Sequence, residues 1–225
     1  MRILAFLVGL FVCNLSQAQH RLGLELGMNA GAPIPKKISK GAEGKLGINP
    51  ILGLAAQYKL SKRLTLQAAL YYDRKSARYT SPVQYPYIVI SGDSIDSFSG
   101  NVSGTFRNQY LTLPIHVRYA FNTKWSAGGG CYISYLLQGT NTGVVTNGKA
   151  GFNGAFAIDD QQFDESGNIH HLDAGLNAVV QYQLRKHLSL QWQLAYGIPS
   201  VTQATDNFKD KTHNIYTYLT LGYWF

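Results

Sequence analysis

Ionisable side chains that recur with a period of two are the candidates for chemistry in this sequence. They alternate with apolar residues, so each would share one face of a β-strand with its polar neighbours. The set comprises Arg21, Glu25, Asp73, His116, Arg118 and Asp173. If the apolar faces contact lipid, these faces point into a barrel. We expect a structural polar cluster there in which Glu25, Asp73 and Asp173 pair with Arg21 and Arg118, because buried charges must pair or neutralise.

The positions of the histidines do not predict an enzyme. A hydrolase or acyltransferase acting on lipid would need a Ser-His-acid arrangement, or a similar one, at the membrane surface where the ester lies. His116 falls in the middle of a strand inside the predicted barrel, where no acyl chain reaches. No serine stands at a matching offset from the other histidines. We therefore assign no catalytic residue.

A metal or cofactor site is not predicted either. His170 and His171 precede Asp173 and follow an acidic run at 159–165. Adjacent residues of a strand point to opposite faces, and the acidic run lacks the spacing of a calcium loop. No phosphate loop, dinucleotide fingerprint or Cys-x-x-Cys pair is present. We interpret the segment as a solvated loop and expect no cofactor.

The N-terminal residues have the pattern of a Sec signal peptide. A basic residue precedes a nearly continuous apolar run at 3–12, and the small residues Ser16 and Ala18 follow. The run is too short to cross a bilayer as a helix. We place the signal peptide at residues 1–18 and a single domain at residues 19–225.

Composition and charge favour a membrane barrel over a soluble domain. Only 14% of residues are charged, whereas about 25% is usual in soluble domains. The net charge of +8 is scattered along the chain, without the continuous basic stripe of a nucleic-acid reader. We expect outer-membrane lipid and lipopolysaccharide as partners, and no nucleic acid. Cys131 alone remains after export, which excludes a disulfide framework.

Eight segments with apolar–polar alternation predict eight strands. They span residues 21–29, 47–59, 64–79, 105–119, 125–137, 171–183, 188–197 and 212–225. Their connections alternate short and long, as in outer-membrane barrels with tight periplasmic turns. The predicted fold is all-β: an eight-stranded antiparallel up-and-down transmembrane β-barrel with both termini at the periplasmic side. Pro114 interrupts the fourth strand, and we expect a β-bulge there.

The long connections would carry any surface for a partner. They span residues 30–46, 80–104, 138–169 and 198–211. The expected contact aromatics are Tyr85, Tyr87, Phe98 and Phe106. We interpret the basic cluster Arg74-Lys75-Arg78 as solvated loop charge.

The last strand is the most hydrophobic one. Leu219, Leu221, Tyr223 and Phe225 share one face, which we expect to face lipid. The strand must pair with the first, because an open sheet edge is not stable in a bilayer. Leu221, Tyr223 and Phe225 also look like the signal that the barrel-assembly machinery reads in outer-membrane proteins.

Five short motifs carry a resemblance to a known family. They lie at 24–29, at 110–119 (Tyr-Leu-Thr-Leu-Pro-Ile-His-Val-Arg-Tyr), at 128–132, at 172–176 and at 221–225. With these motifs the chain resembles the PorT-like outer-membrane β-barrel family of Bacteroidota over nearly all of its mature length. The resemblance implies an outer-membrane barrel, and some members of the family are tied to the type IX secretion machinery.

These observations predict a non-catalytic integral protein of the outer membrane of a Gram-negative bacterium. Its role would be structural, or binding through the extracellular loops. The alternatives are an accessory component of a type IX-like secretion machine, a lipid A-modifying enzyme and a narrow pore. Co-purification with secretion or envelope proteins, mass changes in lipid A, and conductance in planar bilayers would distinguish them.

Overall fold

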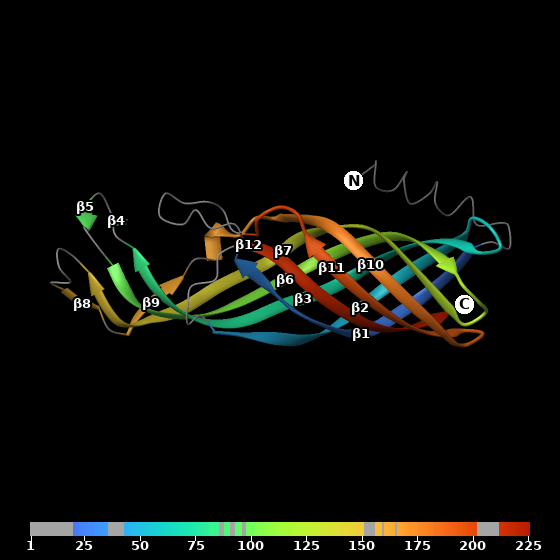
Figure 1. Cartoon of the computed structure of the whole chain (residues 1–225), viewed down its shortest axis with the longest axis horizontal. Coiled ribbons are helices and arrows are strands. Elements are labelled where there is room, and N and C mark those ends of the chain that lie inside the picture. The colour runs from blue at the N-terminus through green and yellow to red at the C-terminus, as the bar shows by residue number, and fades with distance from the viewer. Residues whose placement is uncertain are drawn as a thin grey trace.

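Eight long strands form a closed antiparallel barrel in the computed structural model, counted over the residues it describes (Figure 1). These are residues 20–35, 43–85, 88–90, 93–95, 98–150, 156–158, 160–164, 166–201 and 212–225. The barrel strands are β1 (His20–Pro35), β2 (Glu43–Lys59), β3 (Leu64–Tyr85), β6 (Phe98–Ala120), β7 (Trp125–Ala150), β10 (Leu172–Arg185), β11 (Leu188–Gly197) and β12 (Thr212–Trp224). The connections contain β4 (Ile88–Ile90), β5 (Asp93–Ile95), β8 (Phe156–Ile158), β9 (Gln161–Asp164) and the 3-10 helix η2 (Ser166–Asn168). The predicted signal peptide lies outside the described residues.

Each long strand pairs with its neighbours in the sequence, and the last strand pairs with the first. The order around the ring is β1-β2-β3-β6-β7-β10-β11-β12, and every pair is antiparallel. β12 pairs with β1 from Gly23↔Trp224 to Pro35↔Thr212. The C-terminus lies at the end of the barrel that holds the short turns (Figure 1). The predicted eight-stranded up-and-down barrel is confirmed.

Alternation along the strands separates an apolar outer wall from a polar interior. On β1, Leu24, Leu26 and Met28 expose 41%, 59% and 61% of their surface, whereas Glu25 and Asn29 each expose 1%. An apolar wall of this extent is unfavourable in water. Lipid solvates it, and the closed ladder leaves no barrel strand with an unpaired edge in the hydrocarbon. The wall therefore marks the part of the barrel that lies in a membrane.

The seam between β1 and β12 requires a glycine. A Cβ atom on Gly27 would lie 2.1 Å from the backbone oxygen of Leu219 and 2.8 Å from Cα of Thr220. Only a residue without a side chain allows this approach of two backbones. Next along the seam, the fully buried Trp224 packs over Gly23. The closing contact is thus made by small residues on one strand and a large one on the other.

The outward face of β12 is the apolar one. Leu219, Leu221, Tyr223 and Phe225 expose between 44% and 68% of their surface. The backbone N–H of Phe225 donates to the oxygen of Leu22 at 2.9 Å, so pairing continues to the final residue. These side chains therefore face lipid, and their role as an assembly signal stays a prediction.

The predicted bulge at Pro114 is wrong. Pro114 pairs with Tyr132 of β7 in a register that has no shift at this point. Towards β3 the pairing skips two residues and resumes in the same register, from Ile115 to Thr112. A strand residue offers its N–H to one neighbour only. Proline therefore removes a single ladder bond, and no extra residue is needed to accommodate it.

Three strands extend well beyond the others. β3, β6 and β7 have 22, 23 and 26 residues, whereas the other barrel strands have between 10 and 17. Their far parts remain paired, and β8 and β9 pair with the far part of β7 (Figure 1). We define the projecting sheet as residues 78–85, 98–105 and 142–150 together with β8 and β9.

Much of what the sequence predicts as long loops is therefore strand. The predicted loops at 80–104 and 138–169 contain most of the projecting sheet, and the loop at 30–46 contains the end of β1 and the start of β2. Alternation between lipid and lumen is lost where a sheet leaves the membrane, because both of its faces then meet water. The apolar period that identifies the other strand residues is absent there.

Candidate functional site: the polar lumen

The lumen is filled by layers of hydrogen-bonded polar side chains. At the level nearest the short turns, Arg118 donates to Oε1 of Gln67 at 2.8 Å and also to Gln181. Gln67 donates in turn to Oε1 of Glu25 at 2.9 Å, and Tyr71 donates to the other oxygen of that carboxylate. Gln67 thus links Arg118 to Glu25, and the layer crosses the interior from β6 to β1.

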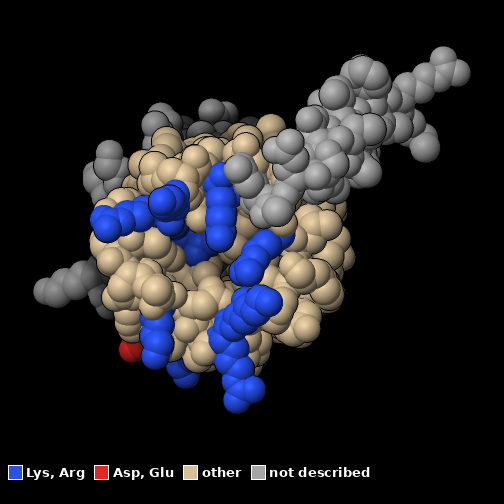
Figure 2. All heavy atoms as spheres, turned by 90° about the vertical axis from the view of Figure 1, so that its right-hand side faces the viewer, with Lys and Arg blue, Asp and Glu red and all other residues tan. Residues whose placement is uncertain are grey.

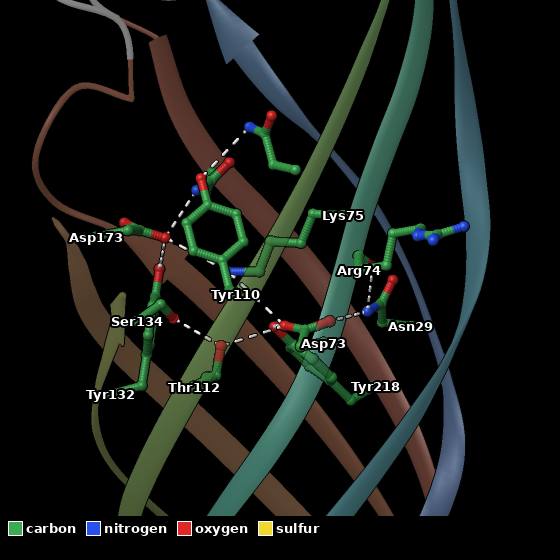
Figure 3. Close-up of polar contacts among 12 residues, drawn as sticks. Asn29, Asp73, Arg74, Lys75, Tyr110, Thr112, Tyr132, Ser134, Asp173 and Tyr218 are labelled. Carbon is green, nitrogen blue, oxygen red and sulfur yellow. Dashed lines mark hydrogen bonds and ion pairs between the residues drawn. The ribbon is translucent and has the colours of Figure 1, made fainter. Parts of the chain in front are cut away.

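A second level is built around two carboxylates and one ammonium (Figure 3). Nζ of Lys75 lies 3.5 Å from Oδ2 of Asp173 and 3.9 Å from Oδ2 of Asp73. All three side chains are at most 3% exposed. They come from β3 and β10, which are not neighbours in the ring. The ammonium therefore ties opposite parts of the barrel wall together through the lumen.

Neutral donors complete the coordination of the two carboxylates. Asp73 accepts from Tyr218 at 3.0 Å, from Thr112 at 3.3 Å and from Asn29. Asp173 accepts from Nδ2 of Asn214 at 2.7 Å and from the hydroxyl of Tyr132 at 3.2 Å. Charge-assisted hydrogen bonds of this kind stabilise buried carboxylates. Two negative charges can therefore share a single cation.

Three tyrosine rings surround the ammonium of Lys75. The distances from Nζ to the ring centroids are 4.5 Å for Tyr110, 5.1 Å for Tyr216 and 5.5 Å for Tyr132. Each lies within the range of a cation–π interaction, which is strongest where water is excluded. Lys75 is thus held by two carboxylates and three aromatic faces. We call Asp73, Lys75, Asp173 and these three tyrosines the lysine box.

The predicted charge pairing is wrong in its cation for Asp73 and Asp173. Glu25, Asp73, His116, Arg118 and Asp173 all lie inside the barrel and are at most 3% exposed. Arg21, in contrast, lies at the mouth and donates to the backbone oxygen of Lys186 at 3.4 Å. Among the described residues, Lys75 makes the ion pairs to Asp73 and Asp173, whereas Arg118 bonds to Gln67, Gln181 and Ser126.

The sequence contained a signal for Lys75 that was missed. Gln67, Ala69, Tyr71 and Asp73 alternate along β3 on the inward face, and Lys75 is the next residue in that series. The prediction grouped it with the exposed Arg74 and Arg78 as loop charge. The direction of the Lys75 side chain follows from alternation along the strand and not from the adjacent Arg74, since neighbouring residues point to opposite faces.

His116 lies buried in the lumen without a hydrogen-bonding partner in the described part of the chain. Both of its ring nitrogens lack one, as do Oδ1 of Asp173 and the hydroxyl of Tyr216. No serine or cysteine contacts this imidazole in any described hydrogen bond.

A metal centre is not formed by the residues that the structure describes. No three side chains of histidine, cysteine, aspartate or glutamate gather closely enough among them to hold an ion. Within the same residues, no helix is long and apolar enough to cross a membrane. The interior arrangement can fill and brace a barrel, and most of its charged groups are hydrogen-bonded to one another or to neutral side chains.

The closed barrel, its apolar wall and its polar interior define an outer-membrane β-barrel protein. The model of the family described as "Outer membrane protein beta-barrel domain" matches residues 16–203. The chain belongs to this family. No curated protein matches the sequence.

Solved structures of outer-membrane proteins are similar to this chain at low identity. Ail, the attachment invasion locus protein of Yersinia pestis, is 12% identical with a TM-score of 0.44, covering 92% of this chain and 99% of that one. OprG of Pseudomonas aeruginosa is 10% identical with a TM-score of 0.38, covering 93% and 97%. Neisserial surface protein A is 11% identical with a TM-score of 0.35, covering 91% and 95%. The family match identifies the chain as an outer-membrane β-barrel protein, and the function is argued from its own residues.

Proposed function

We propose that this barrel is a non-catalytic binding protein that engages an extended polypeptide at the cell surface through its projecting sheet. The observation that carries this proposal is the free edge of β3. β2 pairs with β3 only as far as Glu43↔Thr80, whereas β3 continues to pair with β6 as far as Tyr85↔Phe98. Among the described residues, no strand covers β3 at 81–85 on the side of β2.

A free strand edge presents unpaired backbone donors and acceptors, apart from Pro82, which has no N–H to donate. Another chain can add to it as a further strand, with backbone hydrogen bonds giving affinity and side chains giving specificity. Contacts within the projecting sheet stabilise the strands next to this edge. Phe106 of β6 packs against Tyr79 of β3 with ring centroids 5.2 Å apart, and β9 covers the far part of β7.

The predicted contact aromatics fall partly on this edge. Tyr85 of β3 pairs with Phe98 of β6 at the end of the paired region. Phe106 lies lower on β6, and Tyr87 lies outside the described residues. At the opposite margin of the sheet, hydrogen bonding from Ser166 lowers the pKa of the Asp164 carboxyl on β9.

A photoreactive amino acid at Ser81 tests the proposal in intact cells. Ser81 lies at the start of the free edge, so irradiation should give a discrete crosslinked species larger than the barrel. The matched position is Asn122, which lies in a short turn at the other end and should give no surface-derived species. An absence of any species from Ser81, with the barrel present and folded, would refute the proposal.

The second candidate function is an accessory role in a secretion machine. It would go with membership of the PorT-like group of Bacteroidota. It is supported by the motif Tyr-Leu-Thr-Leu-Pro-Ile-His-Val-Arg-Tyr at 110–119, which carries the resemblance to that group. In this case the surface species from Ser81 would be absent, and the barrel would co-purify with other envelope proteins.

For the last strand, we propose that the barrel-assembly machinery binds it during insertion into the membrane. Deleting Phe225 should reduce the amount of assembled barrel in cells several-fold, while refolding of the purified chain in detergent stays unchanged. The reason is that the ring is 68% exposed and contributes little packing. Heat-modifiable gel mobility measures both quantities. The control is Phe121→Ala, another exposed aromatic at the same end, and equal assembly of the two variants would contradict the role.

A further inference from the structure

The end of the barrel with the short turns carries a ring of basic side chains (Figure 2). In outer-membrane barrels this end faces the periplasm. The ring consists of Arg21, Lys59, Lys62, Arg63, Lys124, Arg185 and Lys186. Among the described residues, no aspartate or glutamate lies at this end outside the lumen, where Glu25 is buried one layer deeper.

The turns hold these cations in fixed positions. Oγ of Ser61 accepts from the backbone of Arg63 at 3.3 Å and of Leu64 at 3.1 Å. Oδ1 of Asn122 accepts from the backbone of Lys124 and of Trp125, both at 2.8 Å. A side chain that caps its own turn rigidifies it. The charges are therefore presented on ordered turns.

Neighbouring cations are also brought together without a counter-ion. Arg21 donates to the backbone oxygen of Lys186 at 3.4 Å, so the guanidinium lies beside the turn that carries Lys186. In the described part of the chain, the ion pairs are those of Lys75, far inside the barrel. Like charges gathered at one end of the barrel repel, so an anionic partner that bridges them gains energy.

The arrangement favours a chain of carboxylates over a single small anion or a lipid. Arg21 and Lys59 occupy inward-facing strand positions, which headgroups on the outside of the barrel do not reach. Arg63 is the exception, because it donates to the hydroxyl of the outward Tyr119 at 2.8 Å. A small anion would contact one or two of these groups, whereas a run of carboxylates can contact several at once. The layer of Arg118, Gln67 and Glu25 closes the mouth from within.

We propose that this basic ring is a docking site for an acidic polypeptide segment of a periplasmic protein. Recognition is by multiple charge-assisted hydrogen bonds from arginine and lysine to carboxylates, as in other acidic-motif sites. The site is independent of the projecting sheet, which lies at the opposite end of the barrel. It gives the barrel a second partner, inside the cell envelope.

Binding of a fluorescein-labelled decamer of glutamate to the full chain tests this proposal. The chain is placed in nanodiscs of zwitterionic phosphatidylcholine, and fluorescence anisotropy is followed at low and at high salt. The test variant is K62Q/K124Q/R185Q/K186Q, which removes four exposed cations from the ring. The matched control is K45Q/R78Q/R107Q/K149Q, which removes four exposed cations from the opposite half of the molecule.

The wild-type chain and the control should bind the decamer equally, and the ring variant should bind about ten-fold or more weakly. High salt should weaken binding to the wild type, since the contacts are exposed charges. Heat-modifiable mobility confirms that each chain is folded. Equal affinity of the ring variant and the wild type would overturn the proposal. So would loss of peptide binding in nanodiscs that contain phosphatidylglycerol, since lipid headgroups would then be the occupant.

Discussion

Replacing Lys75 by methionine should lower the free energy of unfolding by about 3–5 kcal/mol. The substitution leaves Asp73 and Asp173 buried without a cation, since no other cation pairs with either among the described residues. It also removes the contact of the ammonium with three tyrosine rings. Methionine retains the length of the side chain, so the loss reports charge rather than volume. Reversible guanidinium unfolding of the chain in detergent micelles gives the measurement.

Two further variants make the result specific for the lysine box. Lys45→Met removes an exposed lysine from β2 and should change stability by no more than about 0.5 kcal/mol. The double variant K75M/D173N should recover part of the loss, because it removes one of the two orphaned carboxylates. A Lys75→Met chain that unfolds at the same denaturant concentration as the wild type would show that the box contributes nothing.

Replacing Gly27 by alanine should destabilise the barrel by about 3 kcal/mol, at the upper end of what overpacking costs. The added Cβ would lie 2.1 Å from the backbone oxygen of Leu219, far closer than two such atoms can approach. β1 or β12 must then shift, and these strands form the seam that closes the ring. The yield of heat-modifiable barrel after refolding, together with its unfolding free energy, measures the effect.

Gly44→Ala is the matched control for the seam. Gly44 also lies in a strand, but the nearest atom to an added Cβ is the backbone oxygen of Arg78 at 4.0 Å. A glycine-to-alanine change in open space reduces the entropy of the unfolded chain, so stability should stay constant or rise slightly. If Gly27→Ala and Gly44→Ala fold equally well, the seam does not depend on a close backbone approach.

The membrane part of the fold could be predicted from sequence because lipid imposes a strong contrast between the two faces of each strand. β11 illustrates this, since Leu190, Trp192 and Leu194 are exposed while Gln191 and Gln193 between them are buried. The predicted strand at 188–197 has the bounds of β11. Wherever one face of a strand meets hydrocarbon and the other a packed polar interior, a period of two is sufficient.

The projecting sheet could not be predicted in the same way. β7 was expected to end at residue 137 and continues to Ala150. In the added part, threonine, glycine and valine occur without apolar alternation, because neither face contacts lipid. Strand pairing there depends on β6 alongside, which is a non-local contact that the sequence pattern does not contain.

The candidate site shows a similar division. Glu25, Asp73 and Asp173 follow from alternation alone, because each falls on a polar strand face. Which cation pairs with them depends on the level each residue occupies along the barrel axis. Arg21 is near the start of β1 and so reaches the mouth, whereas Lys75 lies at the level of both carboxylates. Such levels follow from the stagger of strands around the ring.

The length of β7 affects which extracellular molecules can reach the projecting sheet. A membrane crossing uses about 9–11 residues, so roughly 15 of its 26 residues, or roughly 50 Å of strand, lie beyond the bilayer. Sugar chains on the surrounding lipids compete for that space. A bacterium with short chains would leave the edge of β3 accessible to antibodies, phages and host proteins. One with long chains would mask it, so access to the edge of β3 would depend on the length of the sugar chains around the barrel.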